Sequence, residues 1–403
     1  MMPVKQITTM LNYIQAQQLI TSLSRSFGTE YISLDDADGR VLAEDVAADR
    51  DYPPFNRATM DGYAISTADW ESGTRAFKVQ QVIYAGQVGE AGLQAGYCYK
   101  IMTGAPVPLS ANAVIRREDA TQVDGNVSFS LETMRPYQNI ARQGEDIKAG
   151  TGILSANTLC TPAVVSLLAT LGRHRVMVAS LPKVALFTTG DEVVEVSAAI
   201  KPHQIRNSNE YLLQSLLKKW LIKPAVCNHV IDDKQHLAET LKTVLGFDII
   251  ITCGGVSAGD ADYLPEVLEG LGVKKLFHKL SIRPGKPIWC GQLPMGGLVF
   301  ALPGNPFSCM VTFKLFIEAY LSVCFGLGMP RILTLPFNGK RKRSSGFDEF
   351  FPVSISGEPI AVNLIPINTS GDIRLGLNAD ALALQPCDAD ELNDGDSVSY
   401  LLF

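Results

Sequence analysis

The sequence has few of the residues from which metal centres and disulfide scaffolds are built. Its five histidines, at positions 174, 203, 229, 236 and 278, show no spacing typical of metal ligands. Its eight cysteines include no C-x-x-C pair, which argues against a zinc site and against a secreted disulfide scaffold. We therefore expect reduced thiols, a cytoplasmic location and no histidine-based catalysis.

Positive charge is also scarce in this chain. Its 35 Lys and Arg residues are outnumbered by 41 Asp and Glu residues, which gives a formal net charge of -6. Nonspecific binding of nucleic acid or of an anionic membrane needs a basic surface, so we expect neither partner. No N-terminal stretch has the basic and apolar layout of a signal peptide. The apolar stretch 312–329 is interrupted by Lys314 and Glu318, which predicts a packed helix rather than a membrane span.

The length of 403 residues, with 46% hydrophobic and 19% charged residues, predicts a globular protein of two to four domains. A helix is expected over about 10–27, with Thr8 or Thr9 as its cap. Residues 51–135 are β-like, with runs at 77–84 and 97–102 and Asp-Gly turns at 61–62 and 124–125. After residue 328, short β-like stretches return, with turns at 338–339 and 394–395. Small β domains are therefore expected on both sides of the central region.

The central region alternates between strand-like and helix-like segments from residue 182 to about 300. Strands are expected at 184–187, 225–231 and 248–252, and helices at 210–220 and 234–245. Asn207 and Glu210 have the spacing of a capping box at the start of the first helix. This alternation predicts a doubly wound α/β domain with a parallel sheet.

Five polar or glycine-rich segments follow strands of this domain. In an open α/β sheet, ligands bind outside the carboxyl ends of the strands, so these segments fall on one rim. They are residues 188–192, 232–233, 254–260, 283–287 and 303–306.

The segment 254–260 runs from a strand toward a helix, which exposes backbone N–H groups where a phosphate can bind. Three cations, Lys279, Arg283 and Lys286, lie downstream and need an anionic partner. Carboxylates that share a phosphate pocket usually do so through Mg²⁺. The carboxylates predicted on this rim are Asp191, Glu192, Asp232, Asp260 and Asp262.

A purely structural interpretation of these segments stays open. Gly254-Gly255 and Pro284-Gly285 are dipeptides that often form simple turns. Asp232-Asp233 stands before Lys234, where an acidic residue favours the start of a helix. Their shared position on one rim nevertheless favours a binding site.

Several motifs together resemble one known family. These are residues 53–64 and 101–108, Gly144-Glu145-Asp146, and the loops 188–192, 254–260 and 302–306. In order and spacing, from about residue 8 to 330, the chain resembles the MoeA and gephyrin C-terminal family of molybdopterin molybdenumtransferases.

The resemblance implies a multi-domain α/β plus β architecture. Its parts would be an elongated N-terminal domain formed by residues 1–50 and 138–181, an inserted β domain at 51–137, a pterin-binding α/β domain at 182–330 and a C-terminal β-barrel at 331–403. It implies a homodimer whose site lies near the subunit junction. The implied reaction inserts molybdate into adenylated molybdopterin with release of AMP, assisted by Mg²⁺, and the enzyme that adenylates molybdopterin is a possible partner.

The resemblance also assigns site residues to this chain. The implied catalytic residues are Asp61, Thr103, Asp146, Glu192, Asp232 and Asp262, of which Glu192 and Asp262 would hold the metal. The implied residues around the pterin nucleotide and the oxyanion are Thr189, Gly190, Asp191, Gly254, Gly255, Ser257, Gly259, Asp260, Lys279, Arg283, Lys286, Pro303, Pro306 and Ser370.

The chain departs from the family pattern at three places. Arg283 stands where lysine is frequent, and Pro352 stands near the position of an expected arginine. The interval between Ser370-Gly371 and Asn378 is shortened, and a basic run at 340–343 could supply the missing charge. Two alternatives therefore stay open: a noncatalytic pterin-binding or interaction scaffold of the same fold, and a molybdopterin adenylyltransferase.

Overall fold

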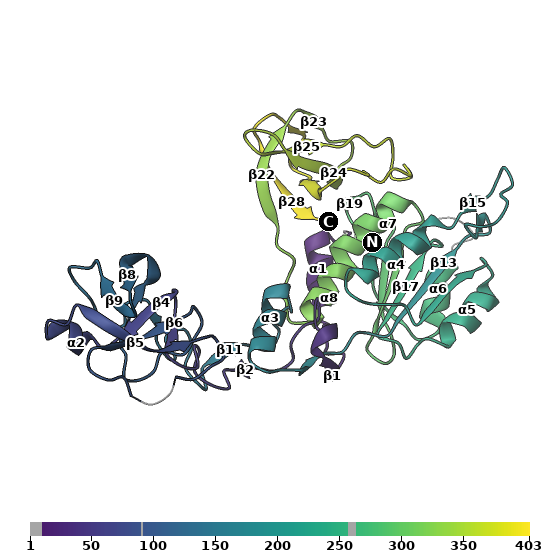
Figure 1. The fold of residues 1–403 in the computed structure, drawn as a ribbon. Coiled ribbons are helices and arrows are strands. Elements are labelled where there is room, and N and C mark those ends of the chain that lie inside the picture. Colours follow the sequence, from purple (N-terminus) through teal and green to yellow (C-terminus); the bar gives the residue numbers. More distant parts are fainter. Residues whose placement is uncertain (1–9, 90–91, 257–262) are drawn as a thin grey trace, which may run out of the picture. The chain divides into compact units, whose positions relative to one another are not determined.

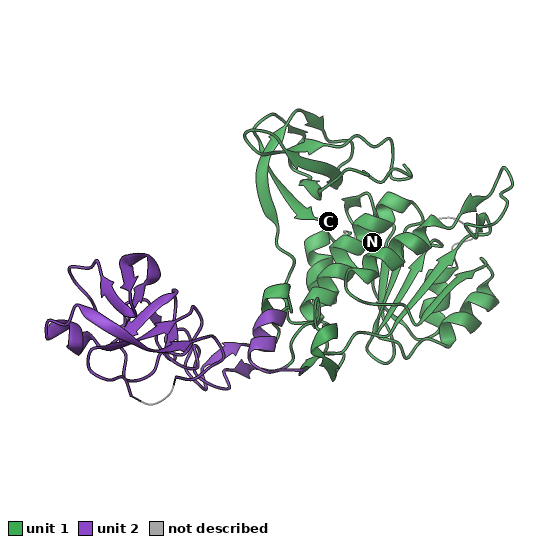
Figure 2. Ribbon diagram, in the orientation of Figure 1, with its two compact units in different colours: residues 1–43, 157–164, 175–403 green, residues 44–156, 165–174 purple. Residues whose placement is uncertain are grey.

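The computed structural model describes residues 10–89, 92–256 and 263–403 (Figure 1). Ser257, Gly259, Asp260 and Asp262, and the expected caps Thr8 and Thr9, lie outside these residues. The chain forms two compact units (Figure 2). Unit 1 comprises Met1–Ala43, Asn157–Val164 and Arg175–Phe403, and unit 2 comprises Glu44–Ala156 and Val165–His174. The boundaries of the four expected domains stay a prediction.

Unit 2 is built on a six-stranded sheet with the strand order β7-β4-β6-β5-β9-β8. Its strands are β4 (Gly62–Ile65), β5 (Ala76–Ile83), β6 (Tyr97–Ile101), β7 (Ala113–Arg116), β8 (Ala120–Val123) and β9 (Asn126–Phe129), with the short helix α2 (Thr67–Glu71). Two small pairs complete the unit, β10 (Ile140–Ala141) with β3 (Arg57–Ala58) and β11 (Gly152–Leu154) with β2 (Val46–Ala47). The β-like runs expected at 77–84 and 97–102 are confirmed as β5 and β6.

The two Asp-Gly dipeptides of unit 2 behave differently. Asp124-Gly125 joins β8 to β9, and both residues have positive φ, as a tight hairpin requires. The turn expected at Asp61-Gly62 is wrong, because Gly62 is the first residue of β4. A Cβ on Gly62 would lie 1.8 Å from the carbonyl oxygen of Ile115 on the neighbouring strand, so glycine is required there by close backbone approach.

Unit 1 contains the expected α/β domain. Its sheet has the order β16-β13-β17-β21-β20-β18, in which the first four strands are parallel and β20 pairs antiparallel with both β21 and β18. The strands are β13 (Val184–Thr189), β16 (Val226–Val230), β17 (Ile249–Cys253), β18 (Lys274–His278), β20 (Trp289–Gln292) and β21 (Leu298–Leu302). The helices are α4 (Ser208–Lys218), α5 (Lys234–Lys242) and α6 (Leu264–Gly270).

Helices cover both faces of this sheet, as a doubly wound fold requires. Alternate residues of a strand point to opposite faces, so Val184 and Leu186 of β13 lie in one core cluster, and Ala185 and Phe187 lie in another. The first cluster includes apolar residues of α1 (Tyr13–Thr21), α4 and the helical run 306–324. The second cluster is formed with α5 and α6.

The N-terminal helix is shorter than expected. It begins after Asn12, whose side chain accepts the N–H of Gln15 in a capping box, so the cap expected at Thr8 or Thr9 is wrong. Near it, β1 (Thr29–Ser33) pairs with β12 (Arg175–Ala179), and α3 (Pro162–Thr170) has residues in both units. The remaining short strands of this half are β14 (Val193–Val194) and β15 (Ile205–Arg206).

The apolar stretch of the sequence forms one helical run of α7 (Pro306–Thr312), a π-helical turn (Phe313–Ile317) and α8 (Glu318–Cys324). By length and composition this run could cross a membrane, but 83% of its most apolar window is buried inside the protein. It is a core helix, and Lys314 and Glu318 pair with each other at 2.7 Å within it.

The C-terminal part of unit 1 is a closed five-stranded barrel, as expected. Strands β24 (Asp348–Ser356), β25 (Ala361–Leu364), β22 (Leu333–Asn338), β28 (Ser397–Leu402) and β26 (Ala381–Gln385) pair in that order, and β26 pairs back with β24. The short β23 (Arg341–Lys342) pairs with β27 (Glu391–Leu392). Strand β19 (Ile282–Arg283) pairs with β24, which connects the barrel to the α/β domain.

Candidate functional site

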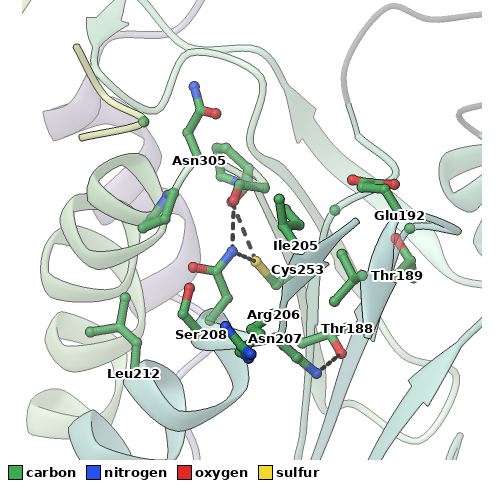
Figure 3. A pocket seen from close by; sticks show the side chains of 18 of the residues that line it. Thr188, Thr189, Glu192, Ile205, Arg206, Asn207, Ser208, Leu212, Cys253 and Asn305 are labelled. Atoms are coloured by element: carbon green, nitrogen blue, oxygen red, sulfur yellow. Dashed lines mark hydrogen bonds between the residues drawn. The ribbon is translucent and has the colours of Figure 1, made fainter. Parts of the chain in front are cut away.

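A cleft of about 910 Å³ lies at the carboxyl ends of the parallel strands in unit 1. All five polar or glycine-rich segments expected on this rim contribute to it. The predicted site residues that line the cleft are Thr189, Gly190, Glu192, Asp232, Gly254, Gly255, Pro303 and Pro306. Figure 3 shows Glu192 and Thr189 on one side of the view, Leu212 on the other, and Ile205 between them.

The glycine loop packs directly on the end of β13. A Cβ on Gly254 would lie 2.6 Å from Thr189 Oγ1 and 2.9 Å from the Thr189 carbonyl oxygen, and its φ is +101°. Gly255 also has a positive φ, of +66°. These positions therefore need glycine both for backbone conformation and for close approach. The loop is a tight turn and also part of the cleft wall, so the two interpretations of Gly254-Gly255 hold together.

Asp232 and Asp233, which follow β16, have different roles. Asp233 caps α5, because its side chain accepts the N–H of His236 at 2.7 Å. Asp232 lines the cleft, and its N–H donates to the Asp191 side chain at 3.3 Å. Asp191 does not itself line the cleft. The capping interpretation is confirmed for one aspartate, and the other faces the cavity.

The segment 204–209 supplies cleft residues that sequence reasoning missed. Asn207 caps α4 as expected, but its Nδ2 also donates to Thr188 Oγ1 at 2.8 Å. Asn209 Nδ2 donates to the Gly304 carbonyl oxygen at 2.6 Å and to Cys253 Sγ at 3.2 Å. These two amides tie the start of α4 to the ends of three strands. The cap motif was the available signal, but it indicated only the start of a helix.

The thiol of Cys253 lines the cleft, and the buried thiol of Cys309 lies behind it. Cys253 Sγ donates to the Pro303 carbonyl oxygen at 3.4 Å and lies 3.7 Å from Cys309 Sγ. The hydrogen bond with Cys253, together with complete burial, raises the pKa of the Cys309 thiol well above its ordinary value. Cys309 is therefore a neutral packing group rather than a nucleophile.

A second cavity, of about 740 Å³, adjoins the cleft and shares Pro287, Pro303 and Asn305 with it. We call it the basic cavity, because Arg283, Lys286 and Arg341 line it. The barrel loop that carries Ser370 also lines it and docks on the start of α7. Ser370 Oγ accepts from Asn305 Nδ2 at 2.9 Å, and the Ser370 carbonyl oxygen accepts from the Phe307 N–H at 3.1 Å. Lys279 lines neither cavity.

The other three predicted catalytic residues belong to unit 2. Asp61 accepts hydrogen bonds from the N–H and the Oγ1 of Thr103, both at 2.7 Å. These bonds, the backbone one first, hold the pKa of Asp61 below its ordinary value. Asp146 is exposed, and its N–H donates to the Tyr52 carbonyl oxygen at 3.1 Å.

The three motif loops of unit 2 are joined by backbone hydrogen bonds. Gly144 N–H donates to the Pro53 carbonyl oxygen at 2.9 Å, and Gly104 N–H donates to that of Ala58 at 2.9 Å. The loop from 53 to 64 therefore contacts both of the others. Segments that are far apart in the sequence therefore lie side by side in unit 2.

Comparison with known proteins identifies the family. A protein from Staphylococcus epidermidis named molybdopterin molybdenumtransferase is 31% identical over 381 residues, which cover 92% of this chain and 90% of that protein. The chain belongs to the molybdopterin molybdenumtransferase family. The Bacillus subtilis protein of the same name is 36% identical over 315 residues, which cover 75% of this chain and 72% of that protein.

Two regional matches and a solved structure agree with this family. The family described as MoeA N-terminal region (domain I and II) matches residues 11–172, and the probable molybdopterin binding domain matches residues 185–322. The crystal structure of the molybdopterin biosynthesis MoeA protein from Pyrococcus horikoshii is similar with a TM-score of 0.84 and 29% identity, covering 98% of this chain and all of that one. The resemblance found in the sequence motifs is therefore confirmed.

Pro352 stands near a position where this family is expected to have an arginine, so its place in the structure matters for the site. Pro352 lies on β24 and lines the basic cavity. Of residues 340–343, Arg341 is the one that lines the same cavity. Its guanidinium pairs with Glu349 at 2.7 Å and donates to the Gln385 side chain. The basic run therefore brings one guanidinium to this cavity, and a carboxylate already offsets its charge.

The fit of a divalent cation rests on oxygen ligands. Glu192 lines the cleft, and Asp262 lies outside the described residues. Within residues 10–89, 92–256 and 263–403, no three His, Cys, Asp or Glu side chains gather as a metal site. Mg²⁺ is commonly held by one or two carboxylates together with substrate phosphate, so Glu192 suits such a shared site.

Proposed function

We propose that this protein inserts molybdate into adenylated molybdopterin and releases AMP, as a molybdopterin molybdenumtransferase. Its family already makes it an enzyme of molybdenum cofactor biosynthesis. The observation that carries the specific proposal is the meeting of five loops in one cleft, within the region matched by the probable molybdopterin binding domain. Such a cleft at strand ends is the usual binding place in an open α/β sheet.

The adjoining cavities suggest where the two substrates bind. We assign the pterin nucleotide to the cleft, where a phosphate can approach the backbone of the loop at Gly254-Gly255 closely because neither residue has a side chain. We assign the oxyanion to the basic cavity, where Arg283 and Lys286 offer positive charge and Ser370 a hydroxyl. In the reaction, water attacks the phosphoanhydride bond and AMP leaves, and the two dithiolene thiols of the pterin replace one oxygen of molybdate, which leaves with their protons as water.

The carboxylates have complementary roles in this proposal. Glu192, with Asp262, would hold Mg²⁺, which neutralises phosphate charge as the bond to AMP breaks. Asp232 lines the same cleft and would orient the nucleotide. The other proposed catalytic residues, Asp61, Thr103 and Asp146, belong to unit 2, where the hydrogen bonds from Thr103 keep Asp61 ionised.

We further propose a cytoplasmic homodimer that receives its substrate from a molybdopterin adenylyltransferase. All eight cysteines are free, which suits a reducing compartment. Asp61, Thr103 and Asp146 are exposed on unit 2, which suits contact with a second subunit. Light scattering at micromolar concentration should give twice the chain mass, and a monomer mass would contradict the dimer.

The decisive test is reconstitution with purified protein, adenylated molybdopterin, Mg²⁺ and molybdate. We expect AMP release together with a cofactor that activates a molybdenum enzyme, and both should fall at least tenfold in Glu192→Gln. Glu195→Gln, an exposed change in the same segment that does not line the cleft, is the matched control. Pterin binding without AMP release would instead support a scaffold. AMP transfer from ATP to molybdopterin would support the adenylyltransferase.

A further inference from the structure

Large aliphatic side chains are exposed along the cleft. Ile373 is 85% exposed, Ile205 56% and Ile200 47%, and all three line the cleft. Ile200 and Ile205 precede α4, whereas Ile373 lies on the barrel loop between β25 and β26. Apolar surface in a concave site indicates that an apolar group binds there, because burial of such surface is favourable.

The barrel loop holds Ile373 in this exposed position. The side chain of the neighbouring Asp372 is only 5% exposed. It accepts the N–H groups of Asn368 and Arg374, both at 3.0 Å, and pairs with the Arg374 guanidinium at 2.6 Å. These contacts, the one with the Arg374 side chain first, hold the pKa of Asp372 well below its ordinary value. Asp372 thus turns inward as an anchor, and the next side chain faces outward.

Ile205 is held equally well on the other segment. Its N–H donates to the Glu192 carbonyl oxygen at 2.9 Å, and the Asn207 N–H donates to that of Val194 at 2.8 Å. These bonds form the parallel pair of β14 and β15. The backbone of Ile205 is therefore held next to the backbone of Glu192. The Ile205 side chain itself carries no polar group.

The cleft thus combines two kinds of wall. Thr189, Gly254 and Gly255 line one part of it, where the two glycines leave the backbone open to the close approach of a phosphate. Ile205 and Ile373 offer aliphatic surface, which contacts the face of a flat ring through dispersion and excludes water. A ligand that carries phosphate at one end and a fused aromatic ring at the other matches both walls.

We propose that Ile205 and Ile373 bind the flat heteroaromatic ring of the substrate and thereby determine how it lies in the cleft. This inference rests on the proposed function, under which the ring is the adenine or the pterin of adenylated molybdopterin. The two isoleucines act as specificity residues, and the phosphate-binding loops act independently of them.

Calorimetry with AMP, with neopterin and with inorganic pyrophosphate tests this assignment in the full-length protein. Replacing an isoleucine with alanine removes three carbon atoms from the ring contact, so Ile373→Ala and Ile205→Ala should weaken ring binding about five- to tenfold. Pyrophosphate binding should not change, and Ile373→Leu should restore ring affinity. Leu377→Ala is the matched control, because Leu377 is also 85% exposed on the same loop but does not line the cleft.

The outcomes separate this inference from the proposed function. Loss of AMP affinity alone identifies adenine as the ring, and loss of neopterin affinity alone identifies the pterin. If the parent binds either ring and both alanine variants bind it equally well, the inference is wrong and the proposed function stands. If the parent binds neither ring, both fail. Unchanged thermal unfolding midpoints in the variants ensure that folding is not the cause.

Discussion

Glu349 shows how a single buried carboxylate organises the basic cavity. Its side chain is 1% exposed and accepts hydrogen bonds from Arg341, from the N–H and hydroxyl of Ser344, and from the Ser345 hydroxyl, at 2.7 to 2.9 Å. Burial alone would raise the pKa of Glu349, but the bonds from Ser344, Arg341 and Ser345 together bring it below the ordinary value of 4.5. The ionised form is therefore the one that this surrounding stabilises.

Glu349→Gln should destabilise the protein by about 1 to 3 kcal/mol near neutral pH, because an amide group would face donors that now bind a carboxylate. The folded-state pKa is lowered, so the stabilisation is fully present above the ordinary value and is lost as pH falls through the folded value. The difference from the parent should shrink at acid pH. Urea unfolding between about pH 7 and pH 3 measures it.

Glu358→Gln, an exposed change on the same barrel, is the control and should leave stability unchanged at every pH. A parent-to-variant difference that stays constant over the acid range would contradict the assigned role of the charge.

Residue-level prediction from sequence succeeded where a local rule applied. Asn207 and Asp233 cap helices because each cap needs only residues within one turn. Glu349 was missed, because its partner Arg341 is held on β23 by pairing with β27, a contact between distant parts of the chain. Gly62 was misjudged for the same reason, since the carbonyl that excludes a side chain there lies on another strand.

The core helix 306–324 also combines a feature that the local sequence predicts with one that depends on a distant contact. Its packing was predictable from its apolar composition, but its π-helical turn at Phe313–Ile317 was not. A π turn leaves backbone groups that need other partners. Gln17 Nε2 on α1 donates to the Leu315 carbonyl oxygen at 2.7 Å, across 298 positions of sequence. A contact over that separation has no local sequence signal.

Gln17→Ala should therefore lower the free energy of unfolding by about 0.5 to 1.5 kcal/mol, the usual net value of one hydrogen bond. Gln18→Ala is the control, because Gln18 is exposed on the same helix and its change should cost less than about 0.5 kcal/mol. Equal unfolding midpoints in urea for the two variants would show that the hydrogen bond from Gln17 to the Leu315 carbonyl oxygen does not stabilise the protein.

For the cleft, the sequence predicted the loops at the strand ends but not the other residues that line it. Strand ends and glycines identified the rim, since parallel strands bring their carboxyl ends to one edge. The resemblance assigned Ser370 of the barrel loop to the site, but the cleft residues Ile373 and Leu375 on that loop were not foreseeable, because their position depends on how the barrel packs against α7.

On the scale of the whole molecule, unit 2 has a core of its own. Phe77, Tyr99 and Ile115 are fully buried within it, and its strands pair only with one another among the described residues. We predict that a fragment from Glu44 to His174 folds alone and unfolds cooperatively. Trp70, its single tryptophan, is 5% exposed, so its fluorescence reports the packed state.

Phe77→Ala provides the negative control for that fragment, since emptying this buried site should cost about 3 to 5 kcal/mol and abolish the folded emission. If Trp70 in the unsubstituted fragment emits as it would in water, unit 2 needs unit 1 in order to fold.

The backbone bonds beside residue 43 bear on how such a chain could arise. Leu42 N–H donates to the Thr158 carbonyl oxygen at 2.9 Å, and Asn157 N–H donates to that of Leu42 at 2.7 Å. The chain thus leaves unit 1 and re-enters it at residues that are hydrogen-bonded to each other. The backbone hydrogen bonds between Leu42 and residues 157–158 therefore do not need residues 44–156. In evolutionary terms, a single insertion event could have added this segment to an ancestor, with no change in the register of β1 and β12.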